Sequence, residues 1–242
     1  MSTPASSSHG PRPQLDRELD ALRRHLVTMA ALVDEQLAHA MNALIEGDAE
    51  AGEEVASRDS RVDALELTID QQCERILALH TPVAADLRML IMAVKINTDF
   101  ERIGDHCRNL ARNAAPLAPY PGLIASTTTP RMADLARSML HGAEEAFLNH
   151  DRLQAREVIA RDQKVNRLHA DNLSHLIEQM RVNPDQAEAL AYLIAVSKAL
   201  ERISDHAKNI AQGVVFLIEG KDIRHQRLSE SGRPSSSGEN RP

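Results

Sequence analysis

The chain has 242 residues, which is enough for one large domain or two small ones with a sizeable buried core. Aromatic residues make up only 2% of it and Trp is absent, whereas strands are normally rich in aromatic and β-branched residues. We therefore expect an all-α fold. The net charge of −7 argues against a nucleic-acid-binding protein, which would carry a basic stripe.

Both ends of the chain are polar. Residues 1–12 and 221–242 are rich in Ser, Pro and Gly, so we expect two disordered tails. The sequence shows no apolar segment typical of a secretory signal and no run of about 18–20 apolar residues that could span a membrane. Cys73 and Cys107 lack metal-ligand spacing and indicate a reducing compartment. These features predict a cytoplasmic protein.

Signals for helix ends occur at well-separated places between the tails. Three of them are a capping residue followed directly by proline, which suits the first turn of a helix: Thr81-Pro82, Thr129-Pro130 and Asn183-Pro184. Gly47-Asp48 marks a further break, and the proline-rich stretch 117–129 is the expected linker. The predicted helices span residues 14–46, 49–80, 82–114, 130–149, 152–182 and 185–219.

An internal repeat relates the two halves of the chain. ERIGDHCRNLA at 101–111 matches ERISDHAKNIA at 201–211 in Glu, Arg, Ile, Asp, His, Asn and Ala. The segment that begins at Asp48 also matches the one that begins at Asp151, so the second and fifth predicted helices are equivalent. The sequence therefore predicts a duplicated three-helix bundle, with a first bundle at 13–116 and a second at 130–220.

Acidic residues form rows on two helices of the first repeat. Glu101 and Asp105 are four residues apart and share one helix face, in line with the apolar Leu90 and Val94. A second row falls at i, i+4, i+7 and i+11 on the preceding helix: Asp59, Asp63, Glu66 and Asp70. Carboxylates on neighbouring helices could share hard divalent or ferric ions through oxygen ligands.

The second repeat carries the same pattern in part. Asp162 would face Glu201 and Asp205, but Asn166 stands where the first repeat has Asp63. An Asn side chain can coordinate through its carbonyl oxygen but brings no charge. We therefore expect a second site that is weaker than the first or absent.

Ion pairing is an alternative role for these rows, because basic residues lie close by on the same helices: Arg102, Arg108, Arg202 and Lys208. His106 and His206 point about 100° away from the neighbouring Asp, which favours a core or interface role over metal ligation. Another face of the third predicted helix is apolar and predicts core or interdomain packing: Met89, Met92, Ile96, Phe100, Ile103 and Leu110.

At the ERIGDH and ERISDH motifs the chain resembles the PhoU family, the accessory regulators of the phosphate-specific transport system. The resemblance extends over about residues 15–220 and includes DLRMLIMAVKINTDFERIGDHCRNLA from Asp86 and ALERISDHAKNIAQGVVFLIEG near the end. It implies two three-helix bundles side by side that often self-associate, so we expect a homodimer.

The resemblance also implies metal clusters, of iron, zinc, manganese or magnesium, held by paired acidic motifs. In the first repeat these motifs fall on Asp59, Asp63, Glu101 and Asp105. In the second they fall on Asp162, Glu201 and Asp205. Asn166, and Ala199 opposite Asp99, depart from the family pattern and weaken the case for the second cluster.

By the same resemblance, the chain is expected to be a negative regulator of phosphate uptake and of the phosphate-starvation response, and not an enzyme. The implied partners are the phosphate-sensor histidine kinase and the ATPase subunit of the phosphate ABC transporter, through which it would meet the membrane peripherally. Two alternatives remain open: a carboxylate-bridged metalloenzyme in a helical bundle, and a purely structural helical dimer. Against the enzyme, such sites usually add His ligands from a Glu-x-x-His motif.

Overall fold

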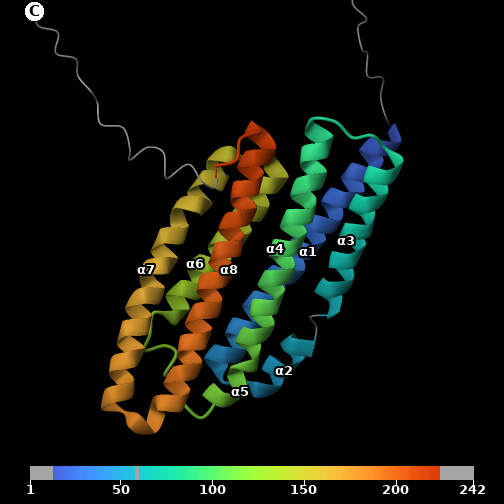
Figure 1. Cartoon of the computed structure of the whole chain (residues 1–242). Coiled ribbons are helices and arrows are strands. Elements are labelled where there is room, and N and C mark those ends of the chain that lie inside the picture. The colour runs from blue at the N-terminus through green and yellow to red at the C-terminus, as the bar shows by residue number, and fades with distance from the viewer. Residues whose placement is uncertain (1–12, 58–59, 224–242) are drawn as a thin grey trace, which may run out of the picture.

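The computed structural model describes residues 13–57 and 60–223, and this part of the chain contains helices and no strand. The all-α prediction is therefore confirmed, with six long helices (Figure 1). In chain order the elements are α1 (Pro13–Glu46), α2 (Ala49–Ser57), α3 (Ser60–Leu79), α4 (Ala85–Arg112), α5 (Ala114–Leu117), α6 (Thr129–Asn149), α7 (Arg152–Val182), the 3-10 turn η1 (Pro184–Gln186) and α8 (Ala187–Glu219).

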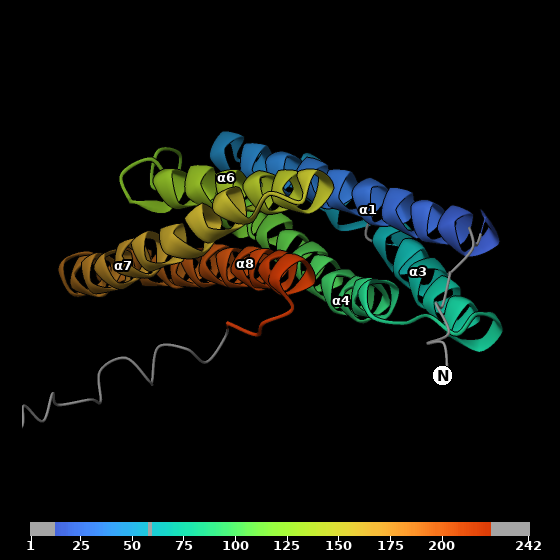
Figure 2. The same ribbon diagram turned by 90° about the horizontal axis from the view of Figure 1, so that it is seen from above.

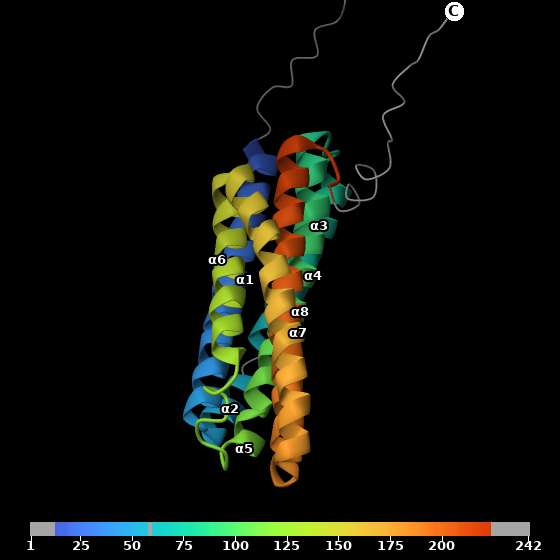
Figure 3. The same cartoon turned by 90° about the vertical axis from the view of Figure 1, so that its left-hand side faces the viewer.

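The long helices form two layers. Helices α3, α4, α8 and α7 lie side by side in one layer, and α1 and α6 lie side by side in the other (Figures 1 and 2). The view from the side shows the two layers edge-on (Figure 3). The first repeat consists of α1, α2, α3 and α4, and the second of α6, α7 and α8, so the duplication predicted from the sequence is present in the fold.

The two repeats meet through equivalent helices. Helices α4 and α8 pack antiparallel at the centre of the layer that α3, α4, α8 and α7 form, and α1 packs against α6 behind them (Figure 1). A pair of hydrogen bonds from Arg137 of α6 to Asp34 of α1, both 3.0 Å long, joins the repeats in the second layer. The predicted apolar face of α4 is buried as expected: Met89, Met92, Ile96, Phe100, Ile103 and Leu110.

The buried apolar side chains of both repeats form one continuous core. Alanine and glycine allow the helices to approach closely at several points. At Gly52 of α2, a Cβ atom would lie 2.6 Å from the carbonyl oxygen of Ala111 at the end of α4. Small residues thus let the helices lie close together, so that they can pack without large aromatic side chains.

Two predicted helix boundaries are wrong. The helix expected at 49–80 is divided into α2 and α3, which are described on either side of residues 58–59. The helix expected from Pro82 begins only at Ala85, because Ala84 adopts a φ of 48° that is incompatible with a right-handed helix. The Thr81-Pro82 signal therefore marks a turn between α3 and α4 and not the cap of α4.

The second repeat follows the predicted boundaries more closely. Helix α7 begins after Asp151, whose Oδ1 accepts hydrogen bonds from the backbone N–H groups of Leu153 and Gln154, a cap that the sequence reading missed. The Asn183-Pro184 signal starts η1, which leads directly into α8. Helix α6 begins at Thr129, with Pro130 in its first turn.

The predicted N-terminal tail, and most of the C-terminal one, lie outside the described residues.

None of the described helices is long and apolar enough to cross a bilayer. Both cysteines are buried and free. Burial raises the pKa of Cys73 to about 12, so its thiol stays protonated and unreactive at neutral pH.

Candidate functional site

The α3–α4 hairpin brings the two acidic rows of the first repeat together. Asn97 of α4 is fully buried, and its Nδ2 donates hydrogen bonds to the carbonyl oxygen of Glu66 at 3.0 Å and to Oδ1 of Asp70 at 2.9 Å. These bonds set the register of the hairpin. One turn further along α4, Glu101 and Asp105 then come level with the start of α3, where the sequence places Asp63.

Arginines of α4 neutralise part of this charge. Arg102 contacts Oε2 of Glu101 through Nε at 3.2 Å and Oδ2 of Asp105 through Nη1 at 3.5 Å. Arg108 donates a hydrogen bond to Oδ1 of Asp105 from one turn further on. The ion pairing that the sequence suggested is therefore present. In these contacts the arginines and the acids lie on the same helix, α4.

Two glutamates of this cluster have raised pKa values. Burial raises the pKa of Glu101, and the neighbouring Asp105 adds to this. Burial likewise raises the pKa of Glu66, supported by Asp70 and Asp63. Arg102 opposes both shifts without cancelling them. The first repeat thus holds carboxylates from two helices close enough to repel one another, an arrangement that a bound cation would stabilise.

In the second repeat Arg202 contacts Glu201 at 3.7 Å and Asp205 at 3.5 Å, as Arg102 does in the first, and lysines add further contacts. Asp162 of α7 is buried, and the ammonium of Lys208 lies between it and Asp205, with Nζ–Oδ distances of 3.0 Å and 2.7 Å. Lys198 contacts Oε2 of Glu201 at 2.6 Å. Burial disfavours the charge of Lys208, but the hydrogen bonds to Asp205 and Asp162 outweigh it and raise the lysine pKa. A side-chain cation therefore occupies the centre of this cluster.

The second repeat also replaces an acid of the first, and the asparagine that is hydrogen-bonded to the acidic helix. By the alignment of Asp48 with Asp151, Glu66 corresponds to His169, and by the alignment of Glu101 with Glu201, Asn97 corresponds to Ser197. His169 and Ser197 are hydrogen-bonded to each other at 2.9 Å, in place of the Asn97 bonds of the first repeat. Burial and the charge of Lys198 lower the pKa of His169 against the opposing effect of Glu201, which keeps this imidazole largely neutral at neutral pH.

The two motif histidines lie at the interface of the repeats, as predicted. The rings of His106 and His206 are 5.7 Å apart between α4 and α8. His206 Nδ1 pairs with Oδ1 of Asp99 at 2.8 Å, and Asn209 Nδ2 donates to the same oxygen at 3.4 Å. The equivalent of Asp99 in the second repeat is Ala199, so His106 has no matching acid there. Burial and the charge of His206 lower the pKa of His106.

The predicted metal ligands can now be placed. Asp63, Glu101 and Asp105 belong to the acidic cluster of the first repeat, and Asp162, Glu201 and Asp205 to that of the second. Asp59 lies outside the described residues. Among those that are described, no group of three or more His, Cys, Asp or Glu side chains is arranged to hold a metal ion as it stands. The predicted metal sites therefore remain predictions.

The donor sets of the two repeats differ in how well they suit a metal. The first offers oxygen donors with excess negative charge, which is what hard cations bind. The second already contains Lys208 between two of its three carboxylates, and Asn166 uses its Nδ2 to donate to Asp162 at 3.2 Å. The donor set of the first repeat therefore suits a hard cation, whereas in the second Lys208 already pairs with two of the acids.

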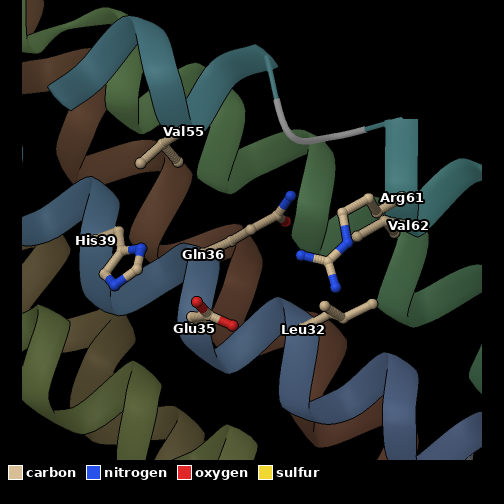
Figure 4. Close-up of a pocket in the computed structure, with 7 residues that line it drawn as sticks. All are labelled: Leu32, Glu35, Gln36, His39, Val55, Arg61 and Val62. Atoms are coloured by element: carbon tan, nitrogen blue, oxygen red, sulfur yellow. The ribbon is translucent and has the colours of Figure 1, made fainter. Parts of the chain in front are cut away.

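A small cavity lies between α1, α2 and α3. Its volume is about 20 Å³, and the residues that line it are Leu32, Glu35, Gln36, His39, Val55, Arg61 and Val62 (Figure 4). The side chains of Gln36 and Arg61 point toward each other across it. Such a volume accommodates one water molecule and no larger ligand.

Fold and site together define a class: a duplicated, antiparallel helical bundle with acidic rows on equivalent helices. The family model described as "PhoU domain" matches the chain twice, at residues 26–114 and 129–214. The chain belongs to the PhoU family. It is 35% identical over 224 residues to the phosphate-specific transport system accessory protein PhoU homolog of Pseudomonas putida, covering 92% of this chain and 88% of that protein.

Solved structures of the family have the same fold. The crystal structure of PhoU from Pseudomonas aeruginosa superimposes with a TM-score of 0.82 at 34% identity and covers 86% of this chain and all of that one. The phosphate transport system regulatory protein PhoU from Streptococcus pneumoniae gives a TM-score of 0.80 at 27% identity over 87% of this chain and 99% of its own. The fold predicted from the repeat is thus shared along nearly the whole chain.

Proposed function

We propose that this protein is a negative regulator of phosphate uptake and of the phosphate-starvation response. In this role it is a non-catalytic adaptor between the ATPase subunit of the phosphate ABC transporter and its sensor histidine kinase. The observation that carries the proposal is the duplicated PhoU domain, which spans both repeats and matches proteins named as accessory to phosphate-specific transport. The chain acts in the cytoplasm as a homodimer and reaches the membrane only through these partners.

The acidic cluster of the first repeat is the proposed metal site. Asp59, Asp63, Glu101 and Asp105 would supply the oxygen ligands for iron, zinc, manganese or magnesium. The pKa values of Glu66 and Glu101 are raised by burial and by the neighbouring carboxylates, which supports this proposal. A bound metal would stabilise the ionised carboxylates. In the second repeat Lys208 already does so for Asp162 and Asp205.

Gene deletion tests the regulatory role. In phosphate-replete cells, deletion should raise the expression of phosphate-starvation genes, and the full-length chain supplied in trans should restore repression. Unchanged expression after deletion would refute the proposal.

Elemental analysis tests the metal site separately. The purified protein should contain metal in stoichiometric amounts, and the double variant Glu101→Ala/Asp105→Ala should lose it. The matched control is Glu201→Ala/Asp205→Ala, which removes the equivalent acids of the second repeat and should leave the metal content unchanged. Protein that takes up no metal when it is offered would leave the acidic rows as ion-paired surfaces. Oxygen consumption or phosphatase turnover by metal-loaded protein would instead indicate an enzyme.

A further inference from the structure

A groove runs between α4 and α8, at the contact between the two repeats. Its volume is about 400 Å³, which falls within the range of about 300–1,000 Å³ that is typical of ligand pockets. Met92, Val94 and Phe216 supply apolar side chains to its lining, and Gly213 lies beside Met92. A Cβ atom at Gly213 would collide with Cε of Met92, so the glycine leaves this space open. The groove can therefore accept an apolar side chain.

The chain turns back toward this groove after α8. Gly220 ends the helix with a φ of 68°, and its N–H donates a hydrogen bond to the carbonyl oxygen of Phe216 at 2.8 Å. A residue in this left-handed conformation stops a helix and changes the direction of the chain. Asp222, two residues further on, lines the groove together with Asn209 and Gly213 of α8. The segment beyond α8 therefore runs back along the helix it has just left (Figure 3).

Packing holds this segment against the bundle as far as Ile223. The side chain of Ile223 is partly buried and packs against the core that both repeats share. The chain therefore continues into residue 224 from an anchored position at the edge of the groove.

The residues that follow include one apolar side chain that can reach the groove. Leu228 is the only large aliphatic residue after Ile223, and residues 1–12 contain no Leu, Ile, Val or Phe. An extended chain advances by about 3.3–3.6 Å per residue, so Leu228 can lie as far as about 17 Å from Ile223. The groove extends from Phe216 to Asn209 along α8, a rise of about 10 Å. Leu228 can therefore reach any part of it.

Covalent attachment makes a single apolar anchor sufficient. A short flexible linker gives the attached segment an effective concentration in the millimolar range, so weak contacts are enough to hold it. The charged side chains that line the groove are Lys95, Asp99 and Asp222, and the segment brings Arg224 and Arg227. Charge contributes little, because Asp99 and Asp222 already have partners of their own. The apolar contact is therefore the main source of binding.

We propose that residues 224–228 fold back over the groove and place Leu228 against Met92 and Phe216. Helix α4 belongs to the first repeat and α8 to the second, so this segment forms a strap across both repeats. The strap closes the groove to other ligands and makes the contact between the repeats depend on the C-terminal segment. The predicted disordered tail then begins at Ser229, from which point the sequence contains no Val, Leu, Ile, Met or aromatic residue.

A tryptophan at position 228 tests the strap directly. The chain contains no Trp, so Leu228→Trp in the full-length protein gives a single fluorophore whose exposure can be measured by acrylamide quenching. The control is Ser236→Trp, further along the same tail. We expect blue-shifted emission from Leu228→Trp and a quenching constant about threefold or more below that of Ser236→Trp, because a docked Trp buries much of its ring. Equal quenching of the two variants would overturn the inference.

A variant of the groove shows where residue 228 docks. Val94 lines the groove and is 40% exposed, so Val94→Lys should leave the fold intact while placing an ammonium on the apolar lining. Combined with Leu228→Trp, it should raise the quenching constant to that of Ser236→Trp. The matched control is Ile177→Lys, at a 41% exposed position on α7 outside the groove, and it should leave the quenching constant low. Protection that survives Val94→Lys in a protein folded by circular dichroism would overturn the inference.

The native leucine can also be tested without a fluorophore. In protein labelled with ¹³C at the methionine methyl groups, Leu228→Ser should shift the NMR resonance of Met92. The resonance of Met139, which is buried in α6 and does not line the groove, should stay unchanged. An unchanged Met92 resonance would overturn the inference even if a tryptophan or lysine variant failed to fold.

Dilution distinguishes a strap within one chain from docking on a second copy. Protection of the fluorophore at position 228 should be independent of protein concentration. Protection that is lost on dilution would show that the segment docks on another chain and would overturn the inference. None of these measurements depends on the proposed regulatory function, so the inference and that function can fail separately.

Discussion

Replacing Lys208 with methionine tests how the second repeat stabilises its acids. The ammonium of Lys208 contacts both Asp162 and Asp205, and the side chain of Asp162 is only 9% exposed. Methionine keeps much of the length of the lysine stem but removes the charge. The variant therefore leaves a buried carboxylate without its cation, a situation that is strongly destabilising in proteins.

The size of the loss follows from the burial of the three groups. Removing one partner of a fully buried ion pair costs about 3–5 kcal/mol. Here water reaches part of the site, since the side chains of Lys208 and Asp205 are 22% and 25% exposed. We therefore expect Lys208→Met to lower the free energy of unfolding by about 2–3 kcal/mol, which corresponds to a decrease in Tm of about 4–12 °C for a chain of this size.

Lys198→Met is the matched control. Lys198 lies on the same helix and also pairs with an acid, Glu201, but its side chain is 44% exposed and it contacts one carboxylate only. An exposed pair of this kind contributes about 0–1 kcal/mol. Both variants remove one lysine and one positive charge, so their difference isolates the effect of burial.

Urea unfolding at neutral pH provides the measurement. The chain has no Trp, so far-ultraviolet circular dichroism is the appropriate signal. The midpoint should decrease much more for Lys208→Met than for Lys198→Met, with equal m-values. Equal losses for the two variants, or a loss below about 1 kcal/mol for Lys208→Met, would show that the two-acid contact does not stabilise the fold.

Three other predictions follow from the packing and charge of the helices. Gly52→Ala should lower the free energy of unfolding by about 1–2 kcal/mol, because its Cβ would meet the backbone oxygen of Ala111 at 2.6 Å. Gly213→Ala, which meets only the flexible end of Met92, should cost less in the same urea titration. Glu101→Gln should raise the midpoint of the metal-free protein at pH 7. The raised pKa of Glu101 means that its ionisation costs stability, so the gain should be full above the folded pKa and vanish below about pH 4, near the pKa in the unfolded chain. In the Lys208→Met variant, millimolar Mn²⁺ should recover part of the lost Tm by replacing the ammonium between Asp162 and Asp205. It should have no comparable effect on the Lys198→Met variant. Equal gains in Tm for both variants would contradict this assignment.

The elements of the fold that could be predicted are those that local sequence determines. Helix periodicity, the near absence of aromatic residues and the repeated ERIxDH motif were sufficient for an all-α duplicated bundle. Local signals also misled at one point. Thr81-Pro82 has the form of a helix cap, but the positive φ of Ala84 delays α4 to Ala85. A capping signal shows that a helix can begin there, and tertiary structure decides whether it does.

The contacts of the candidate site were less predictable, because they depend on the register between helices. The spacing along α8 showed that Lys208 could reach Asp205, but its contact with Asp162 requires the packing of α7 on α8. The pairing of His206 with Asp99 requires α4 and α8 to run antiparallel. The helical phase placed Val94 in an apolar stripe with Leu90, and only the position of α4 at the solvent-facing side of the hairpin exposes it.

The two repeats have the same fold and have diverged in how they balance acidic charge. The second repeat supplies its own cations, with Lys208 placed between two acids and Lys198 on a third. In the first repeat Arg102 and Arg108 both contact Asp105, and burial with the neighbouring Asp105 still raises the pKa of Glu101. A duplicated domain can therefore keep one copy as a stable internal support. In the other copy, the proposed metal ion would take the place that Lys208 holds between the acids of the second repeat.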